Sequence, residues 1–196
     1  PIVAGAQTTL TLFVNDKPSG TPVEDLQIEH EKYYHLIGVR DDLSEFFHLH
    51  PEETSPGNWT VEHVFERGGT YKLWSDIKRG GVVHSFGHPS FTVTGGSSGD
   101  TAETPAKAPV QFLTNVMLAD TQVSLHYDAP LIKGLPEALH ITVKDLYGNG
   151  IALDNYLGAN MHLVIIKDDL SEYVHTHPGG AQAEGECRPG VRAQRL

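Results

Sequence analysis

The sequence predicts an all-β protein made of two sandwich domains in tandem, on the basis of three observations. Short segments that alternate or are rich in β-branched residues are separated by Gly, Pro, Asn and Asp turn signals, which is typical of sandwich strands. No stretch has the 3.6-residue apolar spacing of an amphipathic helix. One segment occurs twice, which indicates a duplicated domain.

The first domain, residues 1–94, contains seven expected strands. Turn signals such as Pro56-Gly57, Gly68-Gly69 and Gly80-Gly81 separate several of them. Short strands separated by such turn signals favour two sheets packed face to face. The expected strands are residues 8–14, 33–40, 45–50, 59–65, 70–77, 82–86 and 90–93.

The second domain is expected at residues 110–180, after a flexible linker of Gly, Ser, Pro and charged residues at 95–109. Residues 110–127 are long enough for two strands, and residues 138–145 resemble a third. The domain then ends early, because residues 181–196 show no alternation and are predicted to be a disordered tail. An incomplete sandwich of this kind predicts a protein partner or self-assembly.

The duplicated segment runs from His35 to Pro51 and again from His162 to Pro178, at a constant offset of 127, with 10 of 17 positions identical. A four-residue turn at Asp41-Asp-Leu-Ser44 places Arg40 opposite Glu45 as a cross-strand charge pair. Counting outward from that turn, the two-residue period of strands places three imidazoles on one face, beside Ile37, Val39 and Phe46. The two predicted triplets are His35, His48 and His50, and His162, His175 and His177.

Three imidazoles on one face of a hairpin indicate a metal site. Paired Cβ atoms lie ~4.5 to 5.5 Å apart across an antiparallel ladder, and a His nitrogen binds zinc at ~2.0 to 2.1 Å. The rings can therefore reach one ion. His84, after the Gly80-Gly81 turn, is the expected fourth ligand in the first domain, with His88 as its alternative.

All-imidazole ligation suits Cu(II), Zn(II) or Ni(II), and affinity at such a site rises to Cu(II). Copper is therefore the first choice and zinc the alternative. The pairs Asp41-Asp42 and Asp168-Asp169 are also compatible with a calcium site. The better interpretation is a turn with solvated carboxylates.

The charge balance, 14 basic against 25 acidic residues, gives a formal net charge of −11 and argues against nucleic acid as a partner. No apolar run is long enough for a membrane-spanning helix, so membrane insertion is not expected. The sequence contains no GxSxG, P-loop, HExxH or GxGxxG motif, and we expect no enzyme activity.

Two other functions stay open. The histidines can be structural parts of a protein-interaction or adhesion module within a surface assembly. A metal-dependent hydrolase is the weakest hypothesis, because no carboxylate of the duplicated block shares the histidine face to act as a base.

Several segments resemble a group of exported, His-rich, often tandem bacterial proteins. They are 29–32, 35–37, 42–51, 69–74, 80–84 and 155–159, and they include Asp42-Leu-Ser-Glu-Phe-Phe-His-Leu-His-Pro51. The resemblance implies immunoglobulin-like or cupredoxin-like sandwiches, a periplasmic, secreted or cell-surface location after removal of a signal peptide, and a link to copper or heavy-metal handling.

Overall fold

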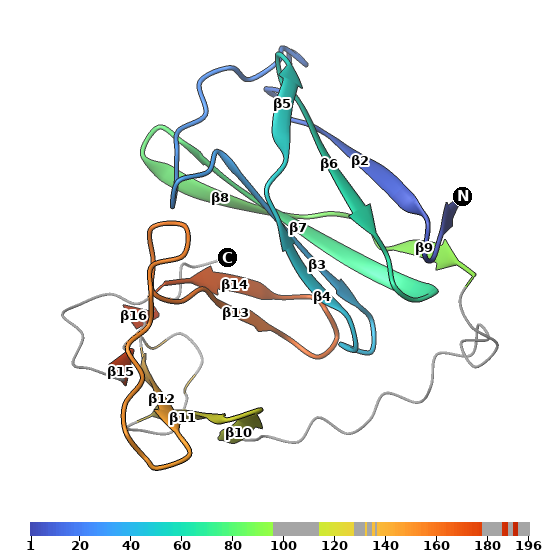
Figure 1. Ribbon diagram of the computed structural model, residues 1–196. Helices are drawn as coiled ribbons and strands as arrows, with labels where there is room; N and C mark the ends of the chain where they lie inside the picture. Colours follow the sequence, from blue (N-terminus) through green and yellow to red (C-terminus); the bar gives the residue numbers. More distant parts are fainter. Residues whose placement is uncertain are drawn as a thin grey trace. The chain divides into compact units, whose positions relative to one another are not determined.

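The computed structural model describes residues 1–95, 114–127, 132, 135, 137–177, 186–187 and 190–191. These residues form strands, turns and loops without a helix, so the predicted all-β class is confirmed (Figure 1). Within this part of the chain there is consequently no helix that could cross a membrane. The chain divides into two compact units, residues 1–109 and 110–196. Apart from Gly95, the predicted linker lies outside the described residues.

Unit 1 contains two sheets that enclose a core. All seven expected strands form; the sequence missed β1 (Ile2–Val3), which has only two residues, and β5 (Glu52–Ser55), whose four residues are all polar and exposed. The longest strand is β7 (Gly69–Arg79). On one edge it pairs with β8 (Val82–Gly87) and, further along, with β9 (Phe91–Thr94); on its other edge it pairs with β3 (Tyr34–Arg40). The larger sheet has the order β1 (Ile2–Val3), β9 (Phe91–Thr94), β7 (Gly69–Arg79), β3 (Tyr34–Arg40), β4 (Phe46–Leu49), with β8 (Val82–Gly87) also on β7. The smaller sheet has the order β2 (Gln7–Phe13), β6 (Asn58–Val64), β5 (Glu52–Ser55).

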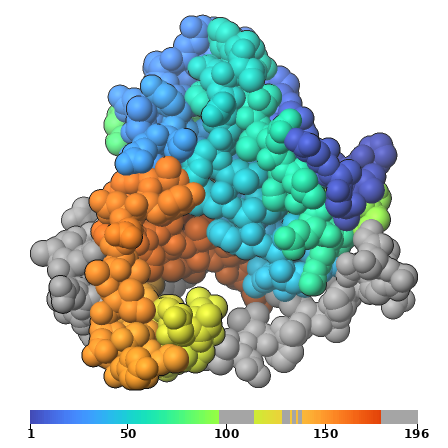
Figure 2. Space-filling model, viewed as in Figure 1, coloured from blue at the N-terminus to red at the C-terminus, as the bar shows by residue number. Residues whose placement is uncertain are grey.

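The core of unit 1 lies between these two sheets. Buried Leu12 and Trp59 come from the smaller sheet, and Tyr34, Leu36 and Phe47 come from the larger one. Alternate residues of β3 therefore face the core, and the residues between them face away from the smaller sheet. In the space-filling view the side chains of β5 and β6 form a continuous surface (Figure 2). The triplet residue His35 lies on the face of β3 opposite to this core.

The hairpin β3–β4 has the predicted register. Val39 pairs with Phe46 and Ile37 with His48, and the Arg40 N–H donates to the Glu45 carbonyl oxygen at 2.9 Å. Within the bend, Leu43 adopts a φ of 63°, and the Ser44 N–H donates to Asp42 Oδ1 at 3.0 Å. These contacts fix the turn and, through it, the register of both strands.

The predicted side-chain pairing of Arg40 with Glu45 does not form. The Arg40 guanidinium pairs with Asp42 instead, since this carboxylate lies in the same bend. Glu45 is buried and accepts hydrogen bonds from the Tyr71 hydroxyl at 2.5 Å and from the Glu66 N–H at 3.0 Å. In the folded chain Arg40 and Glu45 therefore each bond to another group and not to each other.

Gly38 provides the close approach that this hairpin needs. A Cβ at this position would lie 2.1 Å from the Phe47 ring, which occupies the space above the glycine. In the second copy, the equivalent cross-strand pair is Ile165 with Val174. The first hairpin therefore pairs a small residue with a large one at this position, whereas the second hairpin pairs two residues of middle size.

Unit 2 contains a sheet and a separate hairpin in its described part. The sequence predicts a disordered tail at 181–196, yet residues 186–187 and 190–191 pair with β12 (Glu137–Asp145). Backbone pairing with a strand edge requires no apolar alternation. The sheet contains β10 (Asn115–Leu118), β11 (Thr121–Tyr127), β12 (Glu137–Asp145), β15 (Glu186–Cys187) and β16 (Gly190–Val191); the hairpin is β13 (Leu163–Ile166) with β14 (Tyr173–Thr176).

Candidate metal centre

The first histidine triplet converges as the sequence predicts. One ligand nitrogen from each of His35, His48 and His50 lies within 4.8 Å of the other two. His35 Nδ1 is 3.0 Å from His48 Nε2, and the ring centroids of His35 and His50 are 5.0 Å apart. Two nitrogens on one ion are at most about 4.2 Å apart when each bond is ~2.1 Å long. Small side-chain rotations therefore suffice to bring all three onto an ion.

The β3–β4 register gathers these rings. His35 and Ile37 lie on the same face of β3, and Ile37 is directly opposite His48, so both imidazoles project from one side of the hairpin. His50 follows β4 immediately and precedes the buried Pro51. Ile37 and Val39, expected on this face, are buried, whereas Phe46 is half exposed. His35 is itself buried and the other two imidazoles are partly buried.

A main-chain carbonyl orients the first of these ligands. His35 Nε2 lies 2.9 Å from the Glu29 carbonyl oxygen. Because a carbonyl oxygen only accepts, Nε2 carries the proton, and the lone pair of the neutral ring is on Nδ1, which faces His48. Histidine ligands of metals commonly make such an outer hydrogen bond.

The carbonyl is held by a tight turn. Glu29 and Lys32 exchange backbone hydrogen bonds at 2.8 and 3.1 Å, and His30 and Glu31 between them have φ values of 47° and 66°. The Glu29 side chain is held by the Lys78 ammonium at 2.5 Å. The carbonyl position is thus set by both backbone and side-chain contacts.

The second triplet has the same arrangement. Val164 is opposite His175, as Ile37 is opposite His48. His162 Nδ1 lies 3.3 Å from His175 Nε2 and 2.8 Å from His177 Nε2. His162 Nε2 lies 3.0 Å from the Tyr156 carbonyl oxygen, so this ring also carries its proton on Nε2.

The duplication therefore includes the orienting carbonyl. Tyr156 is 127 positions after Glu29, the offset of the histidines, and its backbone pairs with Ala159 as that of Glu29 pairs with Lys32. The side chains differ, but the turn and its carbonyl are the same. The acceptor in this contact is a backbone carbonyl, so comparison of side chains gave no signal for it.

The structure does not bring His84 or His88 to the first triplet. On β7, Asp76 is opposite His35, whereas His84 is opposite the next residue, Ile77, and therefore lies on the other face. His84 is exposed and stacks on Phe86. His88 Nε2 is 2.5 Å from the buried Ser75 hydroxyl, also on the other face. His84 therefore does not lie beside the first triplet, because a difference of one residue in register places a side chain on the other face of the sheet.

Asp76 is the residue near the triplet that the sequence did not reveal. It is directly opposite His35 in the β3–β7 ladder and only 4% exposed. Ser85 Oγ donates to its Oδ1 at 2.6 Å. Aspartate is rare within strands, and its position inside the expected strand 70–77, one residue before its end, was the one available signal. A carboxylate from outside the duplicated block thus shares the histidine face.

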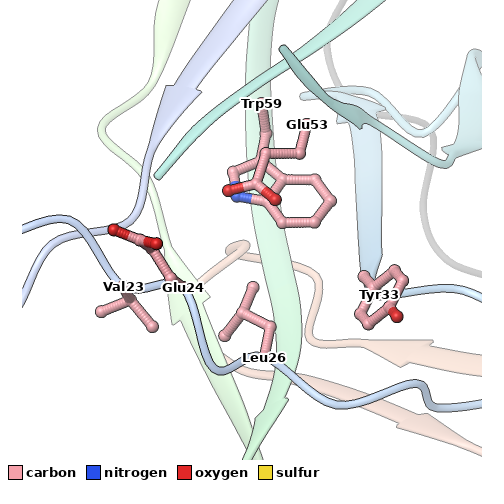
Figure 3. Close-up of a pocket in the computed structure, with 6 residues that line it drawn as sticks. All are labelled: Val23, Glu24, Leu26, Tyr33, Glu53 and Trp59. Carbon is pink, nitrogen blue, oxygen red and sulfur yellow. The ribbon is translucent and has the colours of Figure 1, made fainter. Parts of the chain in front are cut away.

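A surface pocket of about 200 Å³ lies elsewhere in unit 1. The rings of Trp59 and Tyr33 and the carboxylates of Glu24 and Glu53 surround it, together with Val23 and Leu26 (Figure 3). None of the seven predicted ligands lines this pocket. The pocket is therefore separate from the histidine clusters.

The fold and the first triplet define the chain as an all-β protein with a histidine group close enough to bind a metal. It belongs to the domain-of-unknown-function family DUF8832, whose model matches residues 1–95 and 115–194. No curated protein and no solved structure matches the chain.

Proposed function

We propose that this protein binds a transition-metal ion without catalysis, that copper is the ion, and that it acts outside the cytoplasm. The observation that supports the proposal most is the repeated geometry of three imidazoles with one orienting carbonyl. Packing alone requires neither a carbonyl that fixes the tautomer nor a lone pair aimed at two further imidazoles. The extracytoplasmic location is supported by the resemblance to exported His-rich proteins.

Copper is proposed before zinc because of ligand chemistry. Neutral imidazoles are intermediate ligands that suit both Cu(II) and Zn(II), and the usual order of stability favours Cu(II) at a site without strong geometric preference. Zinc favours four ligands, whereas the first triplet supplies three imidazoles in the described part of the chain.

Titration of untagged protein with Cu(II) tests the proposal. Wild type should bind one ion per triplet. We expect His48→Ala/His50→Ala and His175→Ala/His177→Ala each to lose one ion, and the quadruple variant to lose both. His84→Ala/His126→Ala removes two exposed histidines and should retain wild-type stoichiometry. Equal binding by all of these variants would overturn the proposal, and a parallel Zn(II) titration decides between the metals.

A non-catalytic role is proposed although Asp76 shares the histidine face. A general base must reach a metal-bound water, whereas Asp76 is 4% exposed and accepts the hydrogen bond of Ser85. Hydrolysis of ester or phosphate probes by the Zn(II)-loaded protein, abolished in Asp76→Asn, would contradict this part of the proposal.

A role in protein interaction is the second candidate, and β8 is the observation that favours it. In the described residues this strand pairs only with β7, and its apolar Val82 and Phe86 are each 51% exposed. Exposed apolar edges are typical association sites. If this edge mediates self-association, Val82→Lys/Phe86→Lys should convert an oligomer to a monomer in sedimentation experiments without changing Cu(II) binding.

A further inference from the structure

We propose that Asp76 is the charge-compensating group of the first triplet and makes this site bind a divalent ion more tightly than the second triplet does. The inference rests on the proposed metal-binding function and assigns a difference between its two sites. Asp76 is a positioning and charge-setting residue in this proposal, since it is not a member of the group of nitrogens within 4.8 Å of one another.

The placement of Asp76 follows from two ladders. In the β3–β7 ladder it is opposite His35, and in the β7–β8 ladder it is opposite Ser85. Directly opposite residues project to the same face of an antiparallel sheet, with Cβ atoms ~4.5 to 5.5 Å apart. The carboxylate is therefore a neighbour of the imidazole that the Glu29 carbonyl orients, and the bond from Ser85 holds its Oδ1 in place.

A buried carboxylate requires compensation. Asp76 is 4% exposed, and removing a carboxylate from water is costly unless positive charge and hydrogen bonds replace the lost hydration. Three neutral imidazoles leave a divalent ion with its full charge of +2. Asp76 lowers that local charge to +1, and the attraction is strong because the surroundings are shielded from water.

The lysine nearest along this strand face has its own partner. Lys78 is two residues beyond Asp76 on the same face of β7, and its ammonium lies 2.5 Å from Glu29 Oε2. The Lys78–Glu29 pair is neutral as a whole. A metal ion at the triplet would place positive charge beside the buried Asp76.

The second triplet lacks this arrangement in the described residues. β13 pairs only with β14 there, so no strand provides a residue opposite His162 as β7 provides Asp76 opposite His35. The ligands and the orienting carbonyl are duplicated, but the adjacent carboxylate is not. Among the described residues, only the first triplet therefore has a carboxylate opposite its first ligand on a neighbouring strand.

The experiment isolates the first site in the His175→Ala/His177→Ala background and measures Cu(II) and Zn(II) affinity by competition with a chelator. We expect Asp76→Asn to lower the affinity about 10- to 100-fold, the range typical of outer-shell changes. Asparagine keeps the size of the side chain and an oxygen for Ser85. Glu62→Gln removes one exposed negative charge from β6 of the smaller sheet and should change the affinity much less than Asp76→Asn does, because solvent screens this charge.

The Cu(II)/Cu(I) potential separates a charge effect from a purely structural one. Removing a negative charge disfavours Cu(II) more than Cu(I), so the potential should rise in Asp76→Asn and return toward the starting value in Asp76→Glu. The glutamate variant also tests the charge should the asparagine variant fail to fold. The site isolated in the His48→Ala/His50→Ala background should bind Cu(II) more weakly than the first site.

The results that overturn the inference differ from those that overturn the function. Unchanged affinity and potential in Asp76→Asn, with Cu(II) still bound, would overturn the role of Asp76 and leave the metal sites intact. Absence of Cu(II) binding in wild type would overturn the proposed function itself.

Discussion

The Nε2 atom of His35 lies 2.9 Å from the main-chain oxygen of Glu29, which fixes the tautomer of this ring. The same contact, at 3.0 Å, joins His162 to Tyr156 in the second unit. In both units the proton is held on the side away from the other imidazoles. The lone pair on Nδ1 therefore faces His48 in the first triplet, and His175 and His177 in the second.

The first prediction concerns these tautomers. In metal-free protein at neutral pH, two-bond ¹H–¹⁵N spectra should show His35 and His162 protonated on Nε2. On addition of Zn(II), the Nδ1 resonances of these two residues should shift, together with the Nε2 resonances of His48 and His175, because those atoms face one another. An Nδ1-protonated His35 in the metal-free protein would contradict the geometry.

The second prediction concerns stability at mildly acidic pH. Burial lowers the pKa of His63, although Glu45 and Glu66 partly oppose this effect. The unfolded chain therefore binds a proton at His63 before the folded chain does, and the free energy of unfolding falls as pH drops below about 6.5 and through the lowered folded pKa. In urea titrations of metal-free protein between pH 7 and pH 5, His63→Phe should lose less stability than wild type.

The His63→Phe variant should still lose some stability as the pH falls, because a second histidine contributes. Burial also lowers the pKa of His88, with Lys72 adding to the effect, so the sign of its contribution is the same. Identical pH dependence in wild type and His63→Phe would show that His63 does not titrate differently in the two states.

The third prediction tests the close contact between β3 and β4. Gly38→Ala places a methyl group 2.1 Å from the Phe47 ring, so the ring must move within the core. We expect a loss of about 1 to 3 kcal/mol in the free energy of unfolding, the usual cost of overpacking. Gly87→Ala is the matched control: its nearest contact is an ordinary 3.4 Å to Trp74, and its cost should be below about 1 kcal/mol.

The fourth prediction compares the two bends. Asp42→Ala removes the acceptor for Ser44 and the partner of the buried Arg40, and should reduce the free energy of unfolding by about 1.5 to 3 kcal/mol. Asp169→Ala removes the equivalent contacts of Ser171 and Lys167, but that pair is about half exposed. Its effect on the free energy of unfolding should be clearly smaller than that of Asp42→Ala, because water screens this pair. Equal losses in the two variants would show that burial does not set the strength of these bends.

The β3–β4 hairpin shows what the sequence by itself determined. A four-residue bend fixed the register of two adjacent strands, and strand alternation then placed His35 and His48 on one face. The same reasoning worked for His162 and His175. These relationships are local, since each depends on a few residues around one turn and on a period of two.

Only the tertiary structure decided which groups lie beside those histidines. Asp76 reaches the face of His35, and His84 is excluded from it, through the registers of β7 with β3 and with β8. Those registers depend on packing between strands far apart in sequence. If β7 were shifted by one residue against β3, His84 would lie on the face of His35 and Asp76 would lie on the other face. The Glu29 carbonyl was equally inaccessible to side-chain patterns, because its position is set by backbone conformation and by Lys78 from another strand.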